Sequence, residues 1–440
     1  MKNRLPPLVF GIIDPMKNLA QALGPGILFA STAIGVSHLV QSTRAGAEFG
    51  FALIWAVLLA NIFKYPFFEF GSRYANAMGE SLIDGYQRIG KWMVWLYFLI
   101  MLGSMFFVMA AVGAVTSGFL DNLFGIGHLK WVTVGVFVLC VIVLIFGKYK
   151  ILDSMIKIIG AVLLLSTLMA FILTLGRGPS TGGSLISEID LSDAYTFTFL
   201  IALMGWMPTA VDLSTWNSLW TLERINQTGY HPPLKQTLFD FNFGYITSAL
   251  LSICFVTMGA YIMFGTNCEI PNSSAAFAHN VVEMYTASMG DWSYFIIATA
   301  AFSIMFGTCI AVFDGYSRAM QKTSELLFLS RLNAKKALSK RKIYVGSLLI
   351  LAVGAFGVIY YMLFHKADSQ GFKALIDLAT TISFLIAPVI AIVNYRLVTW
   401  KHYPDKAKPK LWLKILAISG IIFLSGFSII YVLFKLGVFE

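Results

Sequence analysis

Long uninterrupted runs of apolar residues alternate with short polar segments along the whole chain. Each run approaches or exceeds the roughly 20 residues that a helix needs to cross the hydrocarbon core of a bilayer. Because apolar and polar residues do not alternate within the runs, they predict spanning helices and not the strands of a membrane barrel. Eleven such runs are present, at about 18–43, 50–75, 91–118, 129–147, 152–175, 195–220, 239–264, 292–318, 343–364, 373–398 and 411–435.

The composition agrees with lipid as the main solvent. Of the 440 residues, 58% are hydrophobic and 12% are charged, whereas a soluble protein has roughly 25% charged residues. No linker or low-complexity segment divides the chain. The prediction is therefore an all-α integral membrane protein with a single transmembrane domain over residues 1–440, surrounded by membrane lipid.

The placement of the basic residues predicts how the chain lies in the membrane. The net charge is +10, which by itself would suit a nucleic-acid partner. Most lysines and arginines fall in alternate loops on one side, which is the positive-inside pattern. The basic residues are therefore expected to set topology and not to bind nucleic acid. The expected location is a bacterial-type cytoplasmic (inner) membrane, crossed many times, with the N-terminus in the cytoplasm and the C-terminus outside.

The loop at about 319–342 is the longest on the basic side. It carries four leucines followed by a basic run, and this combination predicts an amphipathic helix at the membrane interface. Lipid headgroup binding by 331–342 is a further interpretation of the same run. The leucines are Leu326, Leu327, Leu329 and Leu332.

Two of the eleven runs are interrupted near their middle. The first opens with Gly24–Gly26 and carries Gly35–His38, and the sixth carries Met204–Thr209 around Pro208. Glycine and proline interrupt the helical hydrogen-bond ladder and leave backbone groups that need protein, water or a ligand as partners at membrane depth. Two broken helices five spans apart are typical of transporters made of two inverted five-helix repeats with a central site.

We therefore expect repeat one at about 18–175, repeat two at about 195–398, and an extra helix at 411–435. A sequence similarity between the halves is not visible, so the repeat is inferred from the spacing of the breaks.

Three motifs resemble the NRAMP family of divalent-metal transporters. They are Gly-Pro-Gly at 24–26 followed by Ala-Gly-Ala-Glu-Phe-Gly at 45–50, Leu-Leu-Ala-Asn at 58–61, and Met-Pro at 207–208. The likeness is best over helices 1, 2 and 6, and the number of spans agrees along the rest. The resemblance implies a LeuT-type fold and transport of Mn²⁺ or Fe²⁺, usually with protons.

The same comparison shows where the chain departs from the family. The family's helix 1 motif is Asp-Pro-Gly-Asn, but Gly35–His38 reads Gly-Val-Ser-His, so the aspartate ligand is missing and His38 replaces the asparagine. Met207 retains the family's methionine ligand, Met204 corresponds to its carbonyl ligand, Thr209 stands where it has histidine, and Thr380 where it has glutamine. Helix 3, at 91–118, lacks the acidic residues of the family's proton pathway, so proton coupling by that route is not expected.

The residues themselves also suggest a metal site. An imidazole, a thioether and freed carbonyls suit a borderline transition metal, and a methionine disfavours Mg²⁺ and Ca²⁺, which prefer oxygen ligands. The candidates for metal or substrate binding are Gly35, His38, Met204, Met207, Thr209 and Thr380.

Asp212 could supply the missing negative charge. It lies five residues after Met207, about 140° around a helix, so it is expected in a gate or behind the direct ligands.

Charged residues inside the spans are the remaining candidates, because a charge in the membrane needs a partner or water. Lys64 and Glu69 in helix 2 are candidates for gating or charge coupling. Lys64 could replace a coupling cation or anchor a carboxylate, or it could pair with Asp240 or Asp377. Arg44, near the outer vestibule, would repel cations.

The leading hypothesis is a monomeric secondary transporter of divalent transition metal cations that works by alternating access. The alternative keeps the fold but moves an organic or anionic solute, because the helix 1 aspartate is missing. A non-transporting membrane sensor or scaffold is a third reading. No enzyme and no cofactor are expected, because no nucleophile–base set, phosphate loop or multi-histidine motif is present, and the four cysteines form no CxxC pair.

Overall fold

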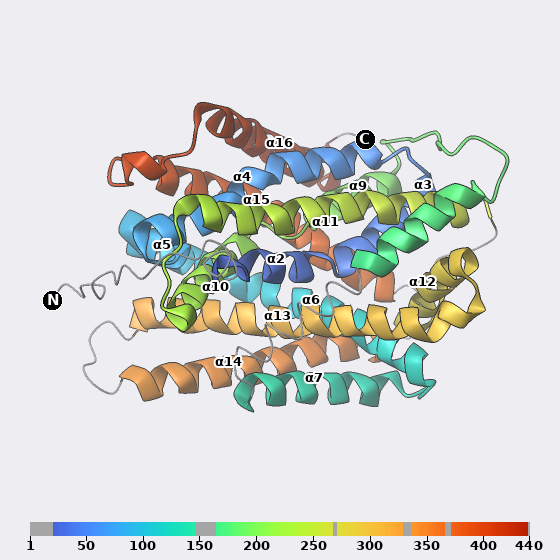
Figure 1. Ribbon diagram of the computed structural model, residues 1–440, viewed down its shortest axis with the longest axis horizontal. Coiled ribbons are helices and arrows are strands. Elements are labelled where there is room, and N and C mark those ends of the chain that lie inside the picture. Colours follow the sequence, from blue (N-terminus) through green and yellow to red (C-terminus); the bar gives the residue numbers. More distant parts are fainter. Residues whose placement is uncertain (1–20, 147–163, 267–270, 329–335, 366–370, 439–440) are drawn as a thin grey trace.

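The computed structural model describes residues 21–146, 164–266, 271–328, 336–365 and 371–438. Within these ranges the chain is helical, and its one β-bridge pairs Gly50 with Ile186. Seven of the described helices are long and apolar enough to cross a membrane. Most long helices lie side by side along one direction (Figure 1). The predicted all-α membrane fold is confirmed.

The order of elements is similar in the two halves of the chain. Each half begins with an interrupted helix, continues with a long helix, a short helix and two further helices, and closes with a final helix. The first half comprises α2 (Pro25–Ala33), η1 (Ser37–Ser42), α3 (Thr43–Phe49), α4 (Ile54–Met78), α5 (Leu82–Ile89), α6 (Lys91–Phe124), α7 (Leu129–Phe146) and the helix Leu164–Arg177. The second comprises α9 (Ala194–Gly205), α10 (Leu213–Thr228), α11 (Leu234–Ile262), α12 (Ser274–Met289), η2 (Asp291–Ser293), α13 (Tyr294–Phe328), α14 (Lys336–Ile359), η3 (Tyr360–His365) and α15 (Gly371–Thr399).

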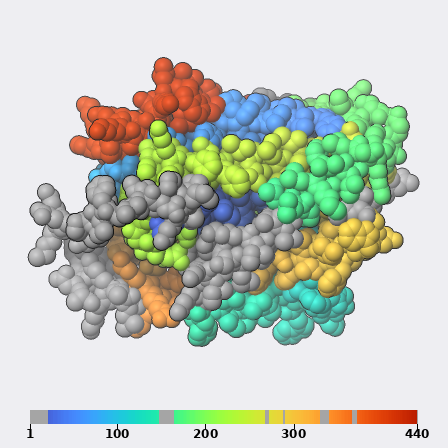
Figure 2. All heavy atoms as spheres, in the orientation of Figure 1, coloured from blue at the N-terminus to red at the C-terminus, as the bar shows by residue number. Residues whose placement is uncertain are grey.

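After the second half, η4 (Asp405–Ala407) leads to α16 (Leu411–Lys435), which packs on α4 at one edge of the molecule (Figure 2). The exact boundaries of the two predicted repeats stay a prediction.

Both predicted breaks are present. α2 ends at Ala33, and the chain passes through Ile34–Val36 before it continues as the π-helix η1. α9 ends at Gly205, and seven residues, 206–212, separate it from α10. Because these breaks come where glycine and proline stand in apolar runs, the sequence located them correctly.

The prediction of an interfacial helix at 319–342 is wrong for residues 319–328. α13 continues without interruption to Phe328, and Leu327 is buried in the protein core instead of facing a membrane surface. Leu329 and Leu332 lie outside the described residues, as does the first part of the span expected at 152–175. The short helices α5 and α12 were not foreseen, because each is shorter than a span.

The lipid-facing surface follows from the exposed apolar side chains. Large hydrophobic residues are exposed on α6, α7, α14 and α16, including Leu99, Ile142, Val353 and Ile422. An apolar surface of this extent would be unusual on a water-soluble monomer. The protein is therefore a multi-pass membrane protein whose polar residues are gathered inside.

The first half of the broken helix 1 is held by α11 at close range. Gly26 and Gly244 let the two backbones touch, since a side chain at either position would collide with backbone atoms of the other helix. Asp240 of α11 accepts hydrogen bonds from the N–H groups of Gly24 (3.0 Å) and Gly26 (2.6 Å). A buried carboxylate thereby satisfies the N-terminus of α2 and complements its dipole.

Asp240→Ala is expected to destabilise the protein by about 1–2 kcal/mol, because two buried N–H groups lose their acceptor. The measurement is thermal unfolding in detergent. Asp405→Ala is the matched control: Lys408 keeps the pKa of the Asp405 carboxyl below its usual range, and this side chain is exposed. Equal melting temperatures for the two variants would contradict a role of Asp240 in holding α2.

Candidate functional site

The two breaks lie inside the helix bundle, where the predicted site residues are shielded from solvent. His38, Met204 and Met207 have no exposed surface, and Thr209 is 7% exposed. Gly35 lies in the break of helix 1 against the side chain of Thr308 on α13. The site is therefore closed in this structure.

His38 is fully engaged by neighbouring groups. Its Nε2 lies 2.8 Å from the carbonyl oxygen of Ser248 on α11, and its Nδ1 lies 2.7 Å from the Ser37 hydroxyl. Since a carbonyl only accepts, Nε2 must carry the proton in this bond. The Ser37 hydroxyl beside Nδ1 also donates to the Ala33 carbonyl. Both ring nitrogens of His38 therefore face protein groups in this arrangement.

Met207 faces the other interrupted helix. Its sulfur lies 3.9 Å from the Ser42 hydroxyl of η1, while the ring of His38 faces Ser248 and Phe255 of α11. His38 and Met207 are the two predicted residues whose side chains could best bind a transition metal. They have different partners here, although both lie in segments that meet at the breaks.

Lys64 crosses from α4 into the break of helix 6. Its ammonium lies 2.5 Å from the carbonyl oxygen of Met204, 2.8 Å from that of Gly205 and 3.3 Å from that of Thr209. The backbone carbonyls freed by the break are therefore bonded to a charged side chain. Among them is the Met204 carbonyl, which corresponds to a ligand in the resembled family.

Asp212 lies close enough to Lys64 for their charges to attract each other. It is 5% exposed and stands at the N-cap of α10. Lys64 pairs with neither of the carboxylates considered from sequence. Asp240 binds the N-terminus of α2, and Asp377 binds Arg44. The long lysine side chain reaches carbonyls on another helix, which its position in the sequence did not reveal.

A second charged cluster joins the second half of helix 1 to α15. The Arg44 guanidinium donates to both oxygens of Asp377, at 2.7 and 3.3 Å, and to Oε1 of Gln41 at 3.1 Å. Gln41 in turn donates to Asp377 at 3.1 Å. Arg44 also lies over the Phe199 ring and 3.6 Å from Glu48. Arg44 is 1% exposed, whereas the side chain of Asp377 is 19% exposed, so the ion pair is buried at the arginine and partly accessible at the carboxylate.

Gln41 and Asp377 were missed as parts of a common site. Gln41, Arg44 and Glu48 stand at three- and four-residue spacings, which places them on one helix face, and this signal was available. The contact with Asp377 was not, because it joins helices from opposite ends of the chain.

The remaining candidates have structural partners. The hydroxyl of Thr380 donates to the Ile376 carbonyl at 2.8 Å within α15. Glu69 forms an ion pair with Arg73 at 2.5 Å, and Arg73 also donates to the Ala407 carbonyl. This pair ties α4 to the segment before α16, away from the breaks. Asp314 and Arg318, four residues apart on α13, also form an ion pair, at 2.7 Å.

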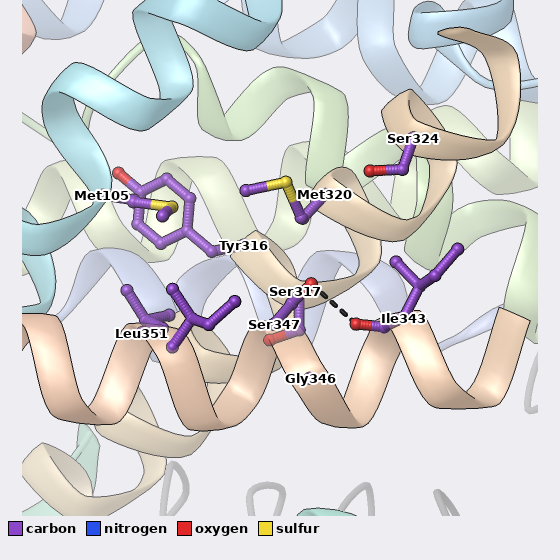
Figure 3. Close-up of a pocket in the computed structure, with 10 residues that line it drawn as sticks. Met105, Tyr316, Ser317, Met320, Ser324, Ile343, Gly346, Ser347 and Leu351 are labelled. Carbon is purple, nitrogen blue, oxygen red and sulfur yellow. Dashed lines mark hydrogen bonds between the residues drawn. The ribbon is translucent and has the colours of Figure 1, made fainter. Parts of the chain in front are cut away.

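Among the residues that the structure describes, no group of three or more histidine, cysteine, aspartate or glutamate side chains could hold a metal ion. A cavity of about 250 Å³ lies elsewhere, between α6, α13 and α14 (Figure 3). Met105, Tyr316 and Leu351 line it, and none of the predicted site residues does.

The sequence and the fold were compared with those of known proteins. The family model described as natural resistance-associated macrophage protein-like (Nramp) matches residues 26–434. An uncharacterized protein of Pasteurella multocida (strain Pm70) is 33% identical over 420 residues, which cover 93% of this chain and 92% of that protein.

Among solved structures, a mutant of the manganese transporter of Eremococcus coleocola matches with a TM-score of 0.71 at 13% identity, over 97% of this chain and 89% of that one. MhsT in complex with L-phenylalanine matches with a TM-score of 0.59 at 12% identity, over 93% and 97% of the two chains. At these identities the likeness shows the fold.

Proposed function

Since the chain belongs to the natural resistance-associated macrophage protein-like (Nramp) family, we propose that it is a secondary transporter whose cargo binds between the breaks of helices 1 and 6 and crosses by alternating access. The family and the fold support a transporter of metal ions or small solutes. The cargo must be argued from the site, because one fold serves many functions, and the structural relatives include a manganese transporter and a protein bound to L-phenylalanine.

The cargo that the geometry supports best is a small organic anion, such as a carboxylate. The observation that carries this proposal is the buried guanidinium of Arg44, which with Gln41 already binds the carboxylate of Asp377. Arginine presents its N–H groups in a planar fork that matches a carboxylate. A cargo carboxylate that replaces Asp377 would meet the same donors.

The absence of a metal-binding group at the helix 1 break supports the same cargo. Gly35 replaces the family's aspartate, both His38 nitrogens face protein groups, and the Met204 carbonyl is bonded to Lys64. A divalent cation would have to displace these partners and would be repelled by the positive charges of Lys64 and Arg44. The same two charges would attract a carboxylate.

Transport of a divalent transition metal such as Mn²⁺ or Fe²⁺ is the second candidate, and Met207 is the observation that favours it. The thioether is buried in the break beside the Ser42 hydroxyl, and a soft ligand of this kind has little use in a site for an organic anion. On this reading, the oxygens of Gln41 and Asp377 would complete the ligand set after Arg44 moves away.

Two groups of ion pairs suit alternating access. Arg44 and Asp377 join α3 to α15 on one side of the breaks. Near the other ends of the helices, Arg318 of α13 lies 3.2 Å from Glu223 of α10, and Lys322 lies 2.6 Å from Asp84 of α5. We propose that the first group closes the outer side and the second the cytoplasmic side, with the N-terminus in the cytoplasm of a bacterial-type inner membrane. Opening one group at a time would expose the breaks alternately.

Uptake into proteoliposomes tests the cargo. Labelled amino acids, monocarboxylates and dicarboxylates are offered in the absence of divalent metals, and Mn²⁺, Fe²⁺ and Mg²⁺ are offered in parallel. We expect saturable uptake of at least one carboxylate and thermal stabilisation by the same compound. Uptake of Mn²⁺ or Fe²⁺, with no carboxylate taken up or bound by folded protein, would reject the organic-anion proposal in favour of the second candidate.

A further inference from the structure

The ammonium of Lys64 occupies the position of a bound cation in the break of helix 6. Three backbone carbonyls, of Met204, Gly205 and Thr209, converge on its Nζ atom at 2.5–3.3 Å. Lys64 has no exposed surface, so its ammonium is enclosed by the protein. An ammonium has three N–H donors and no acceptor, and each donor has one carbonyl acceptor here.

We propose that Lys64 is a built-in cation: it fills a carbonyl site that would otherwise bind a monovalent metal cation such as Na⁺ or K⁺. Carbonyls of unwound helix segments and the negative C-terminal ends of half-helices coordinate small cations in transporters with broken helices. α9 ends at Gly205, so its C-terminal end points its carbonyls at Lys64. The site thus has the chemistry of an ion site, and α4 supplies the ion.

The charge balance favours a monovalent ion over a divalent one. Among the residues that the structure describes, Asp212 is the charged side chain whose charge attracts Lys64. One carboxylate with neutral carbonyls balances a single positive charge, as the lysine provides. Oxygen ligands alone suit Na⁺ or K⁺, which bind carbonyl oxygens in place of their hydration shell.

This assignment makes Lys64 a specificity-determining residue. With the ammonium in place, the wild-type protein needs no external monovalent cation to complete the break of helix 6, and no cargo cation can use the Met204 carbonyl. The three carbonyls around Lys64, which form a carbonyl cage, have this role whichever of the two proposed cargoes is transported.

Lys64→Ala tests the inference, because it removes the ammonium and leaves room beside the three carbonyls. The variant is purified in detergent, and its melting temperature is measured in chloride salts of N-methylglucamine, Li⁺, Na⁺ and K⁺ at equal ionic strength. We expect a loss of several degrees in N-methylglucamine and recovery of most of it by Na⁺ or K⁺, with a saturable dependence on concentration. The wild type should melt at the same temperature in all four salts.

Two further variants separate the cage from general damage to α4. Lys64→Met keeps a side chain of similar volume, which fills the space beside the three carbonyls. No cation should therefore restore the stability that this variant loses. Asn61→Ala, one turn earlier on the same buried helix face, bonds to Val57 and Ser252 and not to the cage, and should show no cation preference. A folded Lys64→Ala protein that responds equally to all four salts overturns the proposal. If that variant does not fold, a wild type that requires Na⁺ or K⁺ for stability overturns it instead.

Discussion

Replacement of Arg44 by glutamine is expected to lower the uptake of small carboxylates by about 30-fold or more. Loss of one partner of a buried, hydrogen-bonded charge pair costs about 2–5 kcal/mol, and about 1.4 kcal/mol corresponds to a factor of ten. Glutamine keeps hydrogen-bonding capacity but loses the charge and the planar fork that binds both oxygens of Asp377 at 2.7 and 3.3 Å. The measurement is the ratio kcat/KM of uptake into proteoliposomes.

The same variant distinguishes the two candidate cargoes by the sign of its effect. For a divalent cation, Arg44 is a repulsive charge beside the path, so its removal should raise Mn²⁺ uptake instead of lowering it. An increase in Mn²⁺ uptake without any carboxylate flux would therefore contradict the organic-anion proposal and support the metal.

Controls must separate this effect from loss of the fold, because Arg44→Gln leaves Asp377 without its charged partner and with Gln41 alone. The double variant Arg44→Gln with Asp377→Asn removes both charges and should regain stability while carboxylate uptake stays low. Arg88→Gln provides the matched control, since Arg88 is half exposed, binds Glu80 and lies away from the breaks. Its uptake should equal that of the wild type.

The fold could be predicted from the sequence because membrane burial leaves strong local signals. A span needs a long apolar run, and a break needs a glycine or proline within such a run. Both signals are contained in short windows, so the positions of the breaks at 34–36 and 206–212 followed from neighbouring residues. The continuation of α13 to Phe328 could not be predicted, because Leu327 is buried by helices that are distant in sequence.

The partners of the site residues could not be predicted, for a physical reason that applies to each of them. His38 bonds to Ser248, Lys64 to Met204 and Arg44 to Asp377, and in every case the partner lies on a helix from the other half of the chain. A residue type limits what a side chain can bind, but the packing of helices decides which group it meets. The sequence therefore identified an unusual lysine and an arginine that would repel cations, without showing that the lysine binds three carbonyls and the arginine binds a carboxylate.

These two basic residues have different consequences for the cargo. Lys64 is saturated by three carbonyls and attracted by Asp212, so it has no donor left for a ligand. Arg44 is held by side chains, and Asp377 is partly exposed at 19%. A side-chain partner such as Asp377 can rotate away, whereas backbone carbonyls cannot leave without moving the helix. Arg44 is therefore the basic group that a cargo can reach.

Gly205→Ala is expected to destabilise the protein by about 1–3 kcal/mol and to abolish uptake. A Cβ at Gly205 would collide with the backbone carbonyl oxygen of Thr380 on α15, and overpacking of a rigid contact costs energy of this size. The collision would push the end of α9 away from α15, and with it the Gly205 carbonyl that binds Lys64 at 2.8 Å. Thermal unfolding and proteoliposome uptake measure the two effects.

Gly103→Ala is the control that fixes the interpretation of Gly205→Ala. Gly103 lies within α6, and the space where its Cβ would stand is open. Alanine is favoured over glycine inside a helix, so this change should leave stability unaltered or raise it by about 0.5–1 kcal/mol. If both variants unfold at the wild-type temperature, α9 and α15 are not in rigid contact at the break. If Gly205→Ala is folded and transports normally, the position of the helix 6 carbonyls does not limit transport.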